Sequence, residues 1–136
     1  MRYLLDTNFI SELRKEERAN RGVLAWSAAH DPMQCALSVI TIGEIRSGIE
    51  NSRPRDLTQA IAIEKWLTEQ LIVFSNNILV VTLSIADRWG RLVAETELPP
   101  QDLLLAATAL EHDLTVITRN VADFEASGAR IYNPWK

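Results

Sequence analysis

Five acidic or amide side chains of this sequence lie where metal-dependent chemistry would need them. Two of them follow short apolar runs that are typical of buried strands, and three lie on segments with helical periodicity. Carboxylates that are brought together raise each other's pKa values unless a cation neutralises them. Oxygen ligands favour Mg²⁺ or Mn²⁺ over zinc, and such a metal is suited to phosphoryl chemistry. The candidate residues are Asp6, Glu44, Asp102, Asn120 and Asp123.

The elements that must position these side chains are short strands that alternate with amphipathic helices. The strands are predicted at residues 2–5, 35–37, 78–81, 114–118 and 130–132. This alternation predicts a single α/β domain over residues 1–136, with a mostly parallel central sheet of about four to five strands flanked by helices. Ligand sites in such sheets lie beyond the carboxyl ends of the strands, which is where Asp6 and Asn120 follow.

Helix boundaries are indicated by capping residues and prolines. Asn20 and Ser38 are predicted N-caps, and Ser84 with Asp87 three residues later is typical of a capping box. The Pro99-Pro100 pair is expected to end one helix and start the next. The longest helix is predicted from about residue 57 to 73, and others carry the apolar residues of 9–13, 23–28, 42–49, 85–93, 101–112 and 121–125.

Composition excludes several classes of protein. The chain has 136 residues, which suffice for one domain, and 14 basic against 18 acidic residues give a net charge of −4. This balance argues against a general nucleic-acid coat protein, but not against an enzyme with an acidic metal site. The single cysteine, Cys35, excludes a disulfide framework and favours a reducing, cytoplasmic location. We expect no membrane association, because no uncharged apolar run approaches the length of a membrane span.

Each candidate side chain also has a purely structural interpretation. Four of the five lie near predicted helix N-termini, where Asp and Asn are favoured as caps and by the helix dipole. Glu44 lies in mid-helix beside Ile42 and Ile45, where a lone glutamate is more often on a solvated flank. The coincidence of all five favours a shared site.

Other reaction classes find less support in the sequence. No Gly-x-Ser-x-Gly or phosphate-loop motif is present, and His30 and His112 have no partners for catalysis. A phosphoacceptor domain needs a lysine at the end of a late strand, and none of the three lysines is placed there. The segment Asp6–Asn8 lacks the second acid of the aspartyl phosphatase motif. A non-catalytic binding module remains the alternative from a different class.

Four motifs, in order along essentially the whole chain, resemble those of the PIN-domain ribonucleases, specifically the VapC or FitB-like toxins. The motifs are Leu4–Asn8 with Ile10–Glu12, then Ser38-x-x-Thr41-x-x-Glu44-Ile45-x-x-Gly48, then Asp102–Ala109, then Thr118–Asn120 with Asp123-Phe124. The ending Asn133–Trp135 also matches this subgroup. The resemblance implies hydrolysis of RNA with Mg²⁺, or Mn²⁺ as a substitute.

The resemblance also assigns roles to individual residues. It implies that Asp6, Glu44 and Asp102 are the metal ligands. Asn120 stands where many relatives have a fourth acid, and Asp123 is the alternative source of that charge. A carboxylate, Glu44 or Asp102, would take the proton of the attacking water.

Hydroxyl and basic side chains near the motifs are further candidates. Thr7 and Thr118 are candidates for orienting carboxylates or water, although capping and packing explain them equally well. Arg46 and Arg119 are candidates for RNA backbone contacts. A basic cluster either steers RNA or forms a solvated helix face, and it consists of Arg14, Lys15, Arg18 and Arg21. The family further implies a small antitoxin partner and a homodimer or toxin–antitoxin hetero-oligomer.

Overall fold

A computed structural model of the chain describes residues 1–136 and alternates strands with helices throughout. The strands are β1 (Tyr3–Leu5), β2 (Cys35–Ser38), β3 (Ile78–Leu79), β4 (Thr115–Ile117) and β5 (Arg130–Tyr132). The helices are α1 (Thr7–Leu13), α2 (Arg21–Ala29), α3 (Val39–Ser52), α4 (Leu57–Val73), α5 (Leu83–Glu95), α6 (Pro100–His112) and α7 (Val121–Phe124). Three short 3₁₀ turns complete the chain at Glu16–Arg18, Pro32–Gln34 and Glu125–Ser127.

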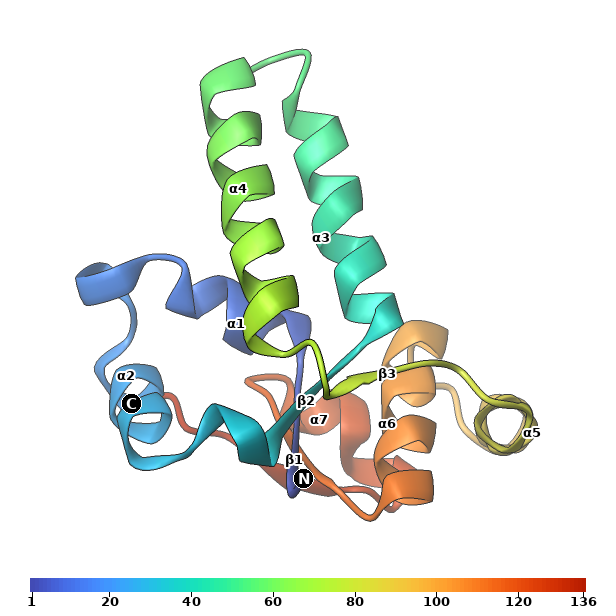
Figure 1. Ribbon diagram of the computed structural model, residues 1–136. Coiled ribbons are helices and arrows are strands. Elements are labelled where there is room, and N and C mark those ends of the chain that lie inside the picture. Colours follow the sequence, from blue (N-terminus) through green and yellow to red (C-terminus); the bar gives the residue numbers. More distant parts are fainter.

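The five strands form one parallel sheet, which confirms the predicted α/β class. Their order is β3-β2-β1-β4-β5, so β1 lies in the centre between β2 and β4. The chain first builds outward from β1 to β3 and then returns to the other side of β1 with β4 (Figure 1). This reversal makes the gap between β1 and β4 the topological switch point, where open α/β sheets bind their ligands.

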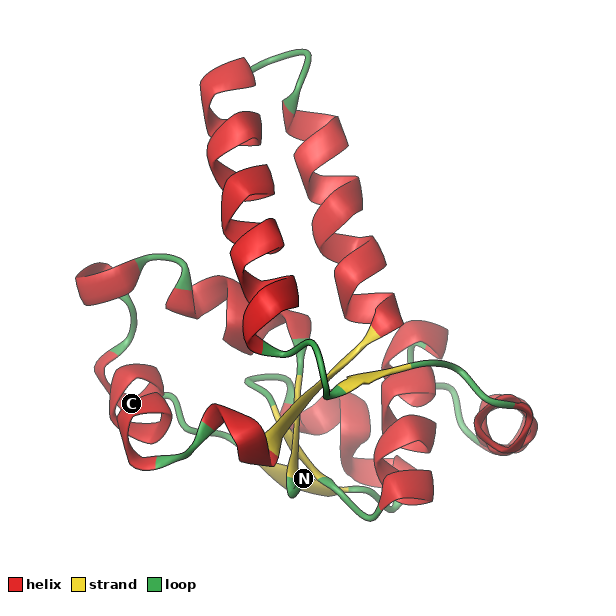
Figure 2. Ribbon diagram, in the orientation of Figure 1, coloured by secondary structure: helices red, strands yellow, loops and turns green.

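Alternate strand residues face opposite sides of the sheet and form two separate cores. Leu5, Leu37 and Ile117 join the core beneath α1 to α4, whereas Leu4 and Val116 join the core beneath α6 and α7. This alternation follows from the two-residue period of a strand, with both faces buried under helices. The result is three layers with the short sheet in the middle (Figure 2). Helix α5 packs against α6, which belongs to the helical layer formed by α6 and α7.

Helices α3 and α4 form a long hairpin that extends away from the sheet (Figure 1). Its inner face is apolar, with Ile45, Ile49, Ala60 and Leu67 buried. The loop between the helices lies far from the carboxyl ends of β1 and β4 (Figure 1). The hairpin therefore carries residues of α3 both at the sheet and well beyond it.

Several helix boundaries are confirmed, and two predictions are wrong in detail. Asn20 and Ser38 accept hydrogen bonds at the starts of α2 and α3, as expected. Ser84 is not the N-cap of α5, because the Thr82 hydroxyl accepts from the backbone N–H of Ile85 and the helix begins at Leu83. The third strand ends at Leu79 rather than at residue 81, since β3 is an edge strand with one neighbour and the chain leaves it early.

Cys35 is buried in β2, and burial raises the pKa of its thiol to about 11, so it stays protonated at neutral pH. No helix combines the length and the apolar character that crossing a bilayer requires.

Candidate active site

Asp6 lies at the carboxyl end of the central strand β1, where hydrogen bonds to Ile117, Thr7 and Thr118 hold it in place. Its backbone N–H donates to the carbonyl of Ile117 at 3.0 Å, which joins the ends of β1 and β4. Its carboxylate Oδ1 accepts from the N–H of Thr7 at 2.7 Å, and Oδ2 accepts from the Thr118 hydroxyl at 2.7 Å. Asp6 is only 7% exposed and Thr118 is fully buried. The orientation of this carboxylate is therefore fixed.

Glu44 reaches the same place from α3. The Ser38 side chain accepts from Ile40 N–H and begins the helix at the carboxyl end of β2, so Glu44 lies between one and two turns further on. Its Oε1 accepts from the Thr7 hydroxyl at 3.0 Å. Thr7 thus connects two carboxylates, because its N–H binds Asp6 and its hydroxyl binds Glu44. One side of Glu44 stays open to solvent.

Asp102 and Asp123 complete the acidic site from the opposite face of the sheet. A helix that crosses over between parallel strands runs antiparallel to them, so the first turn of α6 lies at the carboxyl edge and presents Asp102 there. Asp123 lies on α7, which follows β4 at the same edge. Both are partly buried. We refer to Asp6, Glu44, Asp102 and Asp123 as the acidic site.

Burial, and to a smaller extent charge repulsion, raise the pKa values of Asp6, Glu44 and Asp102. Burial, and then the charges of Asp6, Asp123 and Glu44, raise the pKa of Asp102 to about 6. Burial also raises the pKa of Asp6, and its hydrogen bonds from Thr118 and Thr7 offset part of the effect. Desolvation raises the pKa of Glu44 in the same way. No lysine or arginine lowers the pKa of any of these three carboxyl groups.

Thr118 is the hub of the hydrogen bonds behind Asp6. Its hydroxyl donates to Asp6 and accepts from the Asn8 side-chain amide at 3.3 Å and from the backbone N–H of Asn120 at 3.0 Å. The Asn8 carbonyl oxygen in turn accepts from the N–H of Arg119 at 3.4 Å. Asn8 was not among the expected site residues. Its position two residues after Asp6, on the first turn of a helix next to β4, is the feature that could have identified it.

The structure brings some of the expected residues together and leaves others apart. The side chain of Asn120 is exposed and makes no hydrogen bond that caps α7, whereas Asp123 acts by charge on both Asp6 and Asp102. Arg46 points to glutamates on the α3–α4 hairpin. Arg119 lies over the ring of Trp135, with its Cζ 5.8 Å from the ring centroid. Of the five side chains expected to share a site, the four carboxylates lie at one edge of the sheet, and the exposed side chain of Asn120 makes no hydrogen bond with them.

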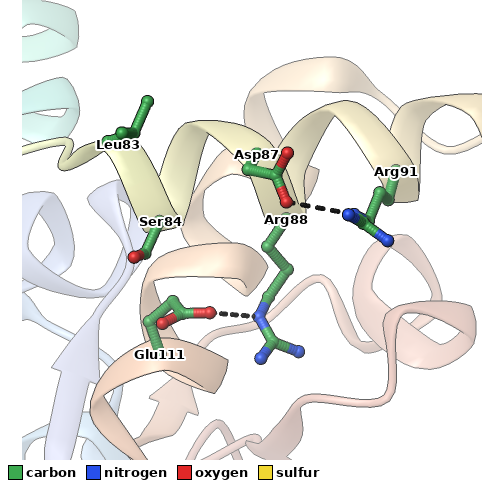
Figure 3. A pocket seen from close by; sticks show the side chains of 6 residues that line it. All are labelled: Leu83, Ser84, Asp87, Arg88, Arg91 and Glu111. Atoms are coloured by element: carbon green, nitrogen blue, oxygen red, sulfur yellow. Dashed lines mark hydrogen bonds and ion pairs between the residues drawn. The ribbon is translucent and has the colours of Figure 1, made fainter.

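The acidic site opens onto a shallow groove beside Glu44. The groove has a volume of about 480 Å³ and runs between the start of α3 and the start of α6, where it is lined by Val39, Ile40, Gly43, Glu44, Ser47 and Gln101. A larger hollow of about 660 Å³ lies between α5 and α6 (Figure 3). Its arginines are already paired, Arg88 with Glu111 and Arg91 with Asp87 (Figure 3). It contains none of the residues of the acidic site.

The donor set of the acidic site fits a hard divalent cation. All four side chains offer carboxylate oxygens, and their mutual repulsion is relieved when a cation binds. As the side chains stand, no three of them converge closely enough to enclose one ion. Enclosing one ion would therefore need side-chain rotations, and Glu44 has more freedom to rotate than Asp6, because only Asp6 is hydrogen-bonded on both oxygens.

Comparisons with known proteins identify the family to which the chain is similar. Residues 3–126 match the PIN domain family. The chain is similar to "VapC ribonuclease Y4jK" of Sinorhizobium fredii, with 35% identity over 98% of this chain and 97% of that protein. It also resembles two solved structures. One is FitAcB from Neisseria gonorrhoeae, with a TM-score of 0.86, 30% identity and 98% coverage of both chains. The other is a toxin-antitoxin complex from Klebsiella pneumoniae, with a TM-score of 0.75, 29% identity and 98% coverage of both chains.

Proposed function

The chain belongs to the PIN-domain family, and on that premise we propose that it is an endoribonuclease toxin whose acidic site binds a divalent metal and cleaves RNA. Relatives named as a ribonuclease and solved as toxin–antitoxin complexes cover nearly the full length of the chain. Ribonuclease activity and inhibition by an antitoxin follow from this relationship.

One observation carries the assignment of the site. Asp6, Glu44 and Asp102 come from three distant segments, meet at the switch point of the sheet and have no cation to neutralise them. A protein rarely retains such repulsion without use for it, since perturbed carboxyl groups cluster at functional sites. We therefore assign these three residues as the metal ligands. Asp123, through its charge on Asp6 and Asp102, is the proposed fourth acid in preference to the exposed Asn120.

The residues of the site have separable tasks in this proposal. Thr118 and the N–H of Thr7 hold both oxygens of Asp6, so its carboxylate is presented in one orientation. The Thr7 hydroxyl holds Oε1 of Glu44, whereas Oε2 makes no hydrogen bond, and Glu44 lines the groove. This free Oε2 is the proposed acceptor for the proton of the attacking water, with Asp102 as the alternative.

Mg²⁺ is the proposed cofactor, with Mn²⁺ as a substitute. When bound, the metal supplies Lewis acidity that withdraws charge from the phosphodiester and from the attacking water. Asp6, Glu44 and Asp102 would hold it through oxygen atoms only, which is the ligand type that both ions prefer.

The proposed partners are RNA, a cognate antitoxin and a second copy of the chain. Self-association is supported by large apolar side chains that are exposed along residues 72–83, with Ile72 at 71%, Val80 at 61% and Leu83 at 87%. Burying such side chains is the usual driving force of a homodimer. Light scattering during size-exclusion chromatography should return twice the mass of one chain. We further propose that the enzyme acts in the cytoplasm, where its RNA substrate is found.

Cleavage of a total small-RNA pool tests the nuclease directly. The purified protein, free of antitoxin, is incubated with Mg²⁺, with Mn²⁺ and with EDTA. Discrete fragments should form with either metal and vanish with EDTA. The variant Asp6→Asn should abolish them, whereas Asp113→Asn should not. Asp113 is a matched control because it is exposed, pairs with Arg130 and lies before β4, at the opposite end of the strand from the acidic site.

Two results would contradict this proposal. Undiminished cleavage by a folded Asp6→Asn protein would assign the activity to a contaminant or to another site. A folded wild-type protein that neither cleaves RNA nor binds a divalent metal by calorimetry would favour the alternative, a non-catalytic binding module built on the PIN fold.

A further inference from the structure

Residues 133–136 fold back onto the start of α2, where the structure is built to receive them (Figure 1). The Asn20 side chain donates to the carbonyl of Lys136 at 2.9 Å and accepts from its N–H at 3.1 Å. Gly22 lies directly beneath Pro134, and a Cβ atom at Gly22 would stand only 2.0 Å from the Pro134 carbonyl oxygen. A glycine is therefore required here by the close approach of the two backbones. This docked segment is called the tail below.

The docked tail places the indole of Trp135 between the core and Arg119. The indole meets the buried ring of Phe9 edge to face, with centroids 6.2 Å apart. The Cζ of Arg119 lies over the same indole, 5.8 Å from its centroid. Phe9 lies on α1, three residues after Asp6, and Arg119 directly follows Thr118. Trp135 thus connects the two segments that carry the centre of the acidic site.

Arg119 makes no ion pair with a carboxylate, in contrast to five of the other ten arginines. Those five are Arg46, Arg53, Arg88, Arg91 and Arg130. The nearby carboxylate of Glu12 is already bound by Lys15 and by the N–H of Asn20, and it makes no ion pair with Arg119. The face of the Arg119 guanidinium is therefore oriented by an aromatic ring, while its N–H groups stay free in solvent.

We infer that Trp135 is a positioning residue, which holds the guanidinium of Arg119 on the α1 side of the molecule, one residue after Thr118, so that its free N–H groups bind an RNA phosphate. This inference rests on the proposed nuclease function and adds a phosphate contact on the α1 side of the site. A guanidinium suits this task because it binds phosphate with two parallel N–H groups while its face stacks on an aromatic ring. Phosphate contacts of this kind contribute to affinity and to its dependence on salt.

The test compares Arg119→Ala, Trp135→Leu and Trp135→Phe on a short single-stranded RNA that the wild-type protein cleaves. Arg119→Ala should raise KM about three- to tenfold, leave kcat within twofold and reduce the salt slope of binding by about 0.7, the value for one phosphate on a single strand. Trp135→Leu should raise KM about two- to fivefold, the worth of one exposed cation–π contact. Trp135→Phe retains an aromatic face and should restore most of the affinity.

Two further variants and one control variant make the test specific. In the double variant Arg119→Ala with Trp135→Leu, KM should equal that of Arg119→Ala alone, because the indole acts through the arginine. Gly22→Ala forces the Pro134 carbonyl to move and should reproduce the rise in KM without altering either partner. Arg55→Ala is the matched control, since Arg55 is an exposed arginine without an ion pair on the distant loop between α3 and α4, and it should leave KM unchanged.

The outcomes separate this inference from the nuclease proposal. Cleavage that depends on Asp6 but is unaffected in KM by Arg119→Ala or Trp135→Leu would overturn the positioning role and leave the nuclease standing. A lower kcat and melting temperature for Trp135→Leu, with an unchanged salt slope, would mean a structural role only and would also overturn it. RNA binding measured by fluorescence anisotropy gives a readout without catalysis. Binding that weakens with Arg119→Ala in a protein that does not cleave would support the phosphate contact and reject the nuclease.

Discussion

The acidic site and the α3–α4 hairpin both contain clustered carboxylates, but only the carboxylates of the hairpin are paired with arginines. On the hairpin, Arg46 and Arg53 surround Glu50 and Glu64 in a closed network of four ion pairs. The hydrogen bonds from Arg53 and Arg46 lower the pKa of Glu50 to about 2, and those from the same arginines lower the pKa of Glu64. In the acidic site, no lysine or arginine acts on Asp6, Glu44 or Asp102, and the pKa values of these three carboxyl groups are raised.

Helix α3 contributes to both regions and keeps them apart. Glu44 and Arg46 are two residues apart, so they project from different faces of the helix. Glu44 binds the Thr7 hydroxyl at the sheet, while Arg46 pairs with Glu50 one turn further on and with Glu64 of α4. The nearest arginine on the helix is thereby held away from the acidic site.

The presence or absence of an arginine partner distinguishes acids that stabilise this fold from acids that are candidates for function. Acids that are matched by arginines stabilise the packing of two helices and need nothing further. Acids that repel one another in a partly buried place lower the stability of the metal-free protein, and a bound cation reverses that cost.

The largest effect is expected when one carboxylate is removed from the acidic site. Asp102→Asn should reduce RNA cleavage by about 100-fold or more, because a proposed metal ligand is lost. The same variant should melt at a higher temperature than the wild type when both are metal-free, since repulsion with Asp6, Asp123 and Glu44 is relieved. Initial rates and thermal unfolding in EDTA measure the two quantities. A variant that is both inactive and less stable in EDTA would mean that Asp102 is a structural acid.

A smaller loss is expected when the orientation of Asp6 is disturbed without altering any charge. Thr118→Val removes the hydroxyl that donates to Asp6 Oδ2 and accepts from Asn8 and Asn120. We expect kcat to fall about tenfold and the free energy of unfolding to fall by about 1–3 kcal/mol, because buried polar groups lose their partner. Thr118→Ser retains the hydroxyl and should keep most of both. Equal losses in Ser and Val would assign the effect to the methyl group and its packing.

Prediction from sequence was most successful where local pattern and topology coincide. The apolar run before Asp6 marked the end of β1 correctly. The run before Asn120 was predicted to end at residue 118, one residue beyond the end of β4 at Ile117. Parallel strands must end at a common edge, so both runs still indicated that edge. The acidic residues of α3 and α6 could be placed near that edge because crossover helices start there. The prediction was wrong at Ser84, where Thr82 and Ser84 are both good caps and only the tertiary position of α5 selects between them.

Contacts between distant segments were beyond the reach of the sequence alone. The choice between Asn120 and Asp123 depends on how the turn after β4 rotates, and three residues are nearly one turn of helix. One partner of Arg46, Glu64, lies 18 residues away on α4, so the distance of Arg46 from the acidic site could not be seen in the motif. The stacking of Arg119 on Trp135 depends on the close approach of Pro134 to Gly22.

The pH dependence of stability should distinguish the two regions without any mutation. The raised pKa of Asp102, about 6 against an ordinary 3.8, means that the folded metal-free protein binds this proton more tightly than the unfolded chain. The stabilisation that protonated Asp102 contributes is therefore complete below pH 3.8 and is lost as the pH rises through about 6. Asp6 and Glu44, whose pKa values are also raised, act in the same direction. Glu50 acts oppositely, since its stabilisation is present above pH 4.5 and is lost as the pH falls toward 2. Glu64, whose pKa is also lowered, acts in the same direction as Glu50.

Urea unfolding in EDTA from pH 4 to 7 measures this dependence. The contribution of the acidic site should fall across the range, and Asp102→Asn should flatten the fall. Saturating Mg²⁺ should reduce it as well, because the metal binds the deprotonated carboxylates. A wild-type protein whose profile is the same as that of Asp102→Asn would show that the carboxylates do not repel one another in solution.

The smallest effect is expected on the hairpin, although its charges lie closest together. Glu64→Gln removes the charge shared by Arg46 and Arg53. All four side chains of the network are at least one third exposed, so water and salt compensate most of the loss, and we expect the melting temperature to fall by at most about 2 °C. Glu69→Gln, on the same helix but without an ion pair, is the matched control. The difference between the two variants should vanish in 1 M salt, and RNA cleavage should be unchanged in both. A loss of cleavage in Glu64→Gln alone would mean that Arg46, once released, interferes with the acidic site, and the two regions would then be coupled through α3.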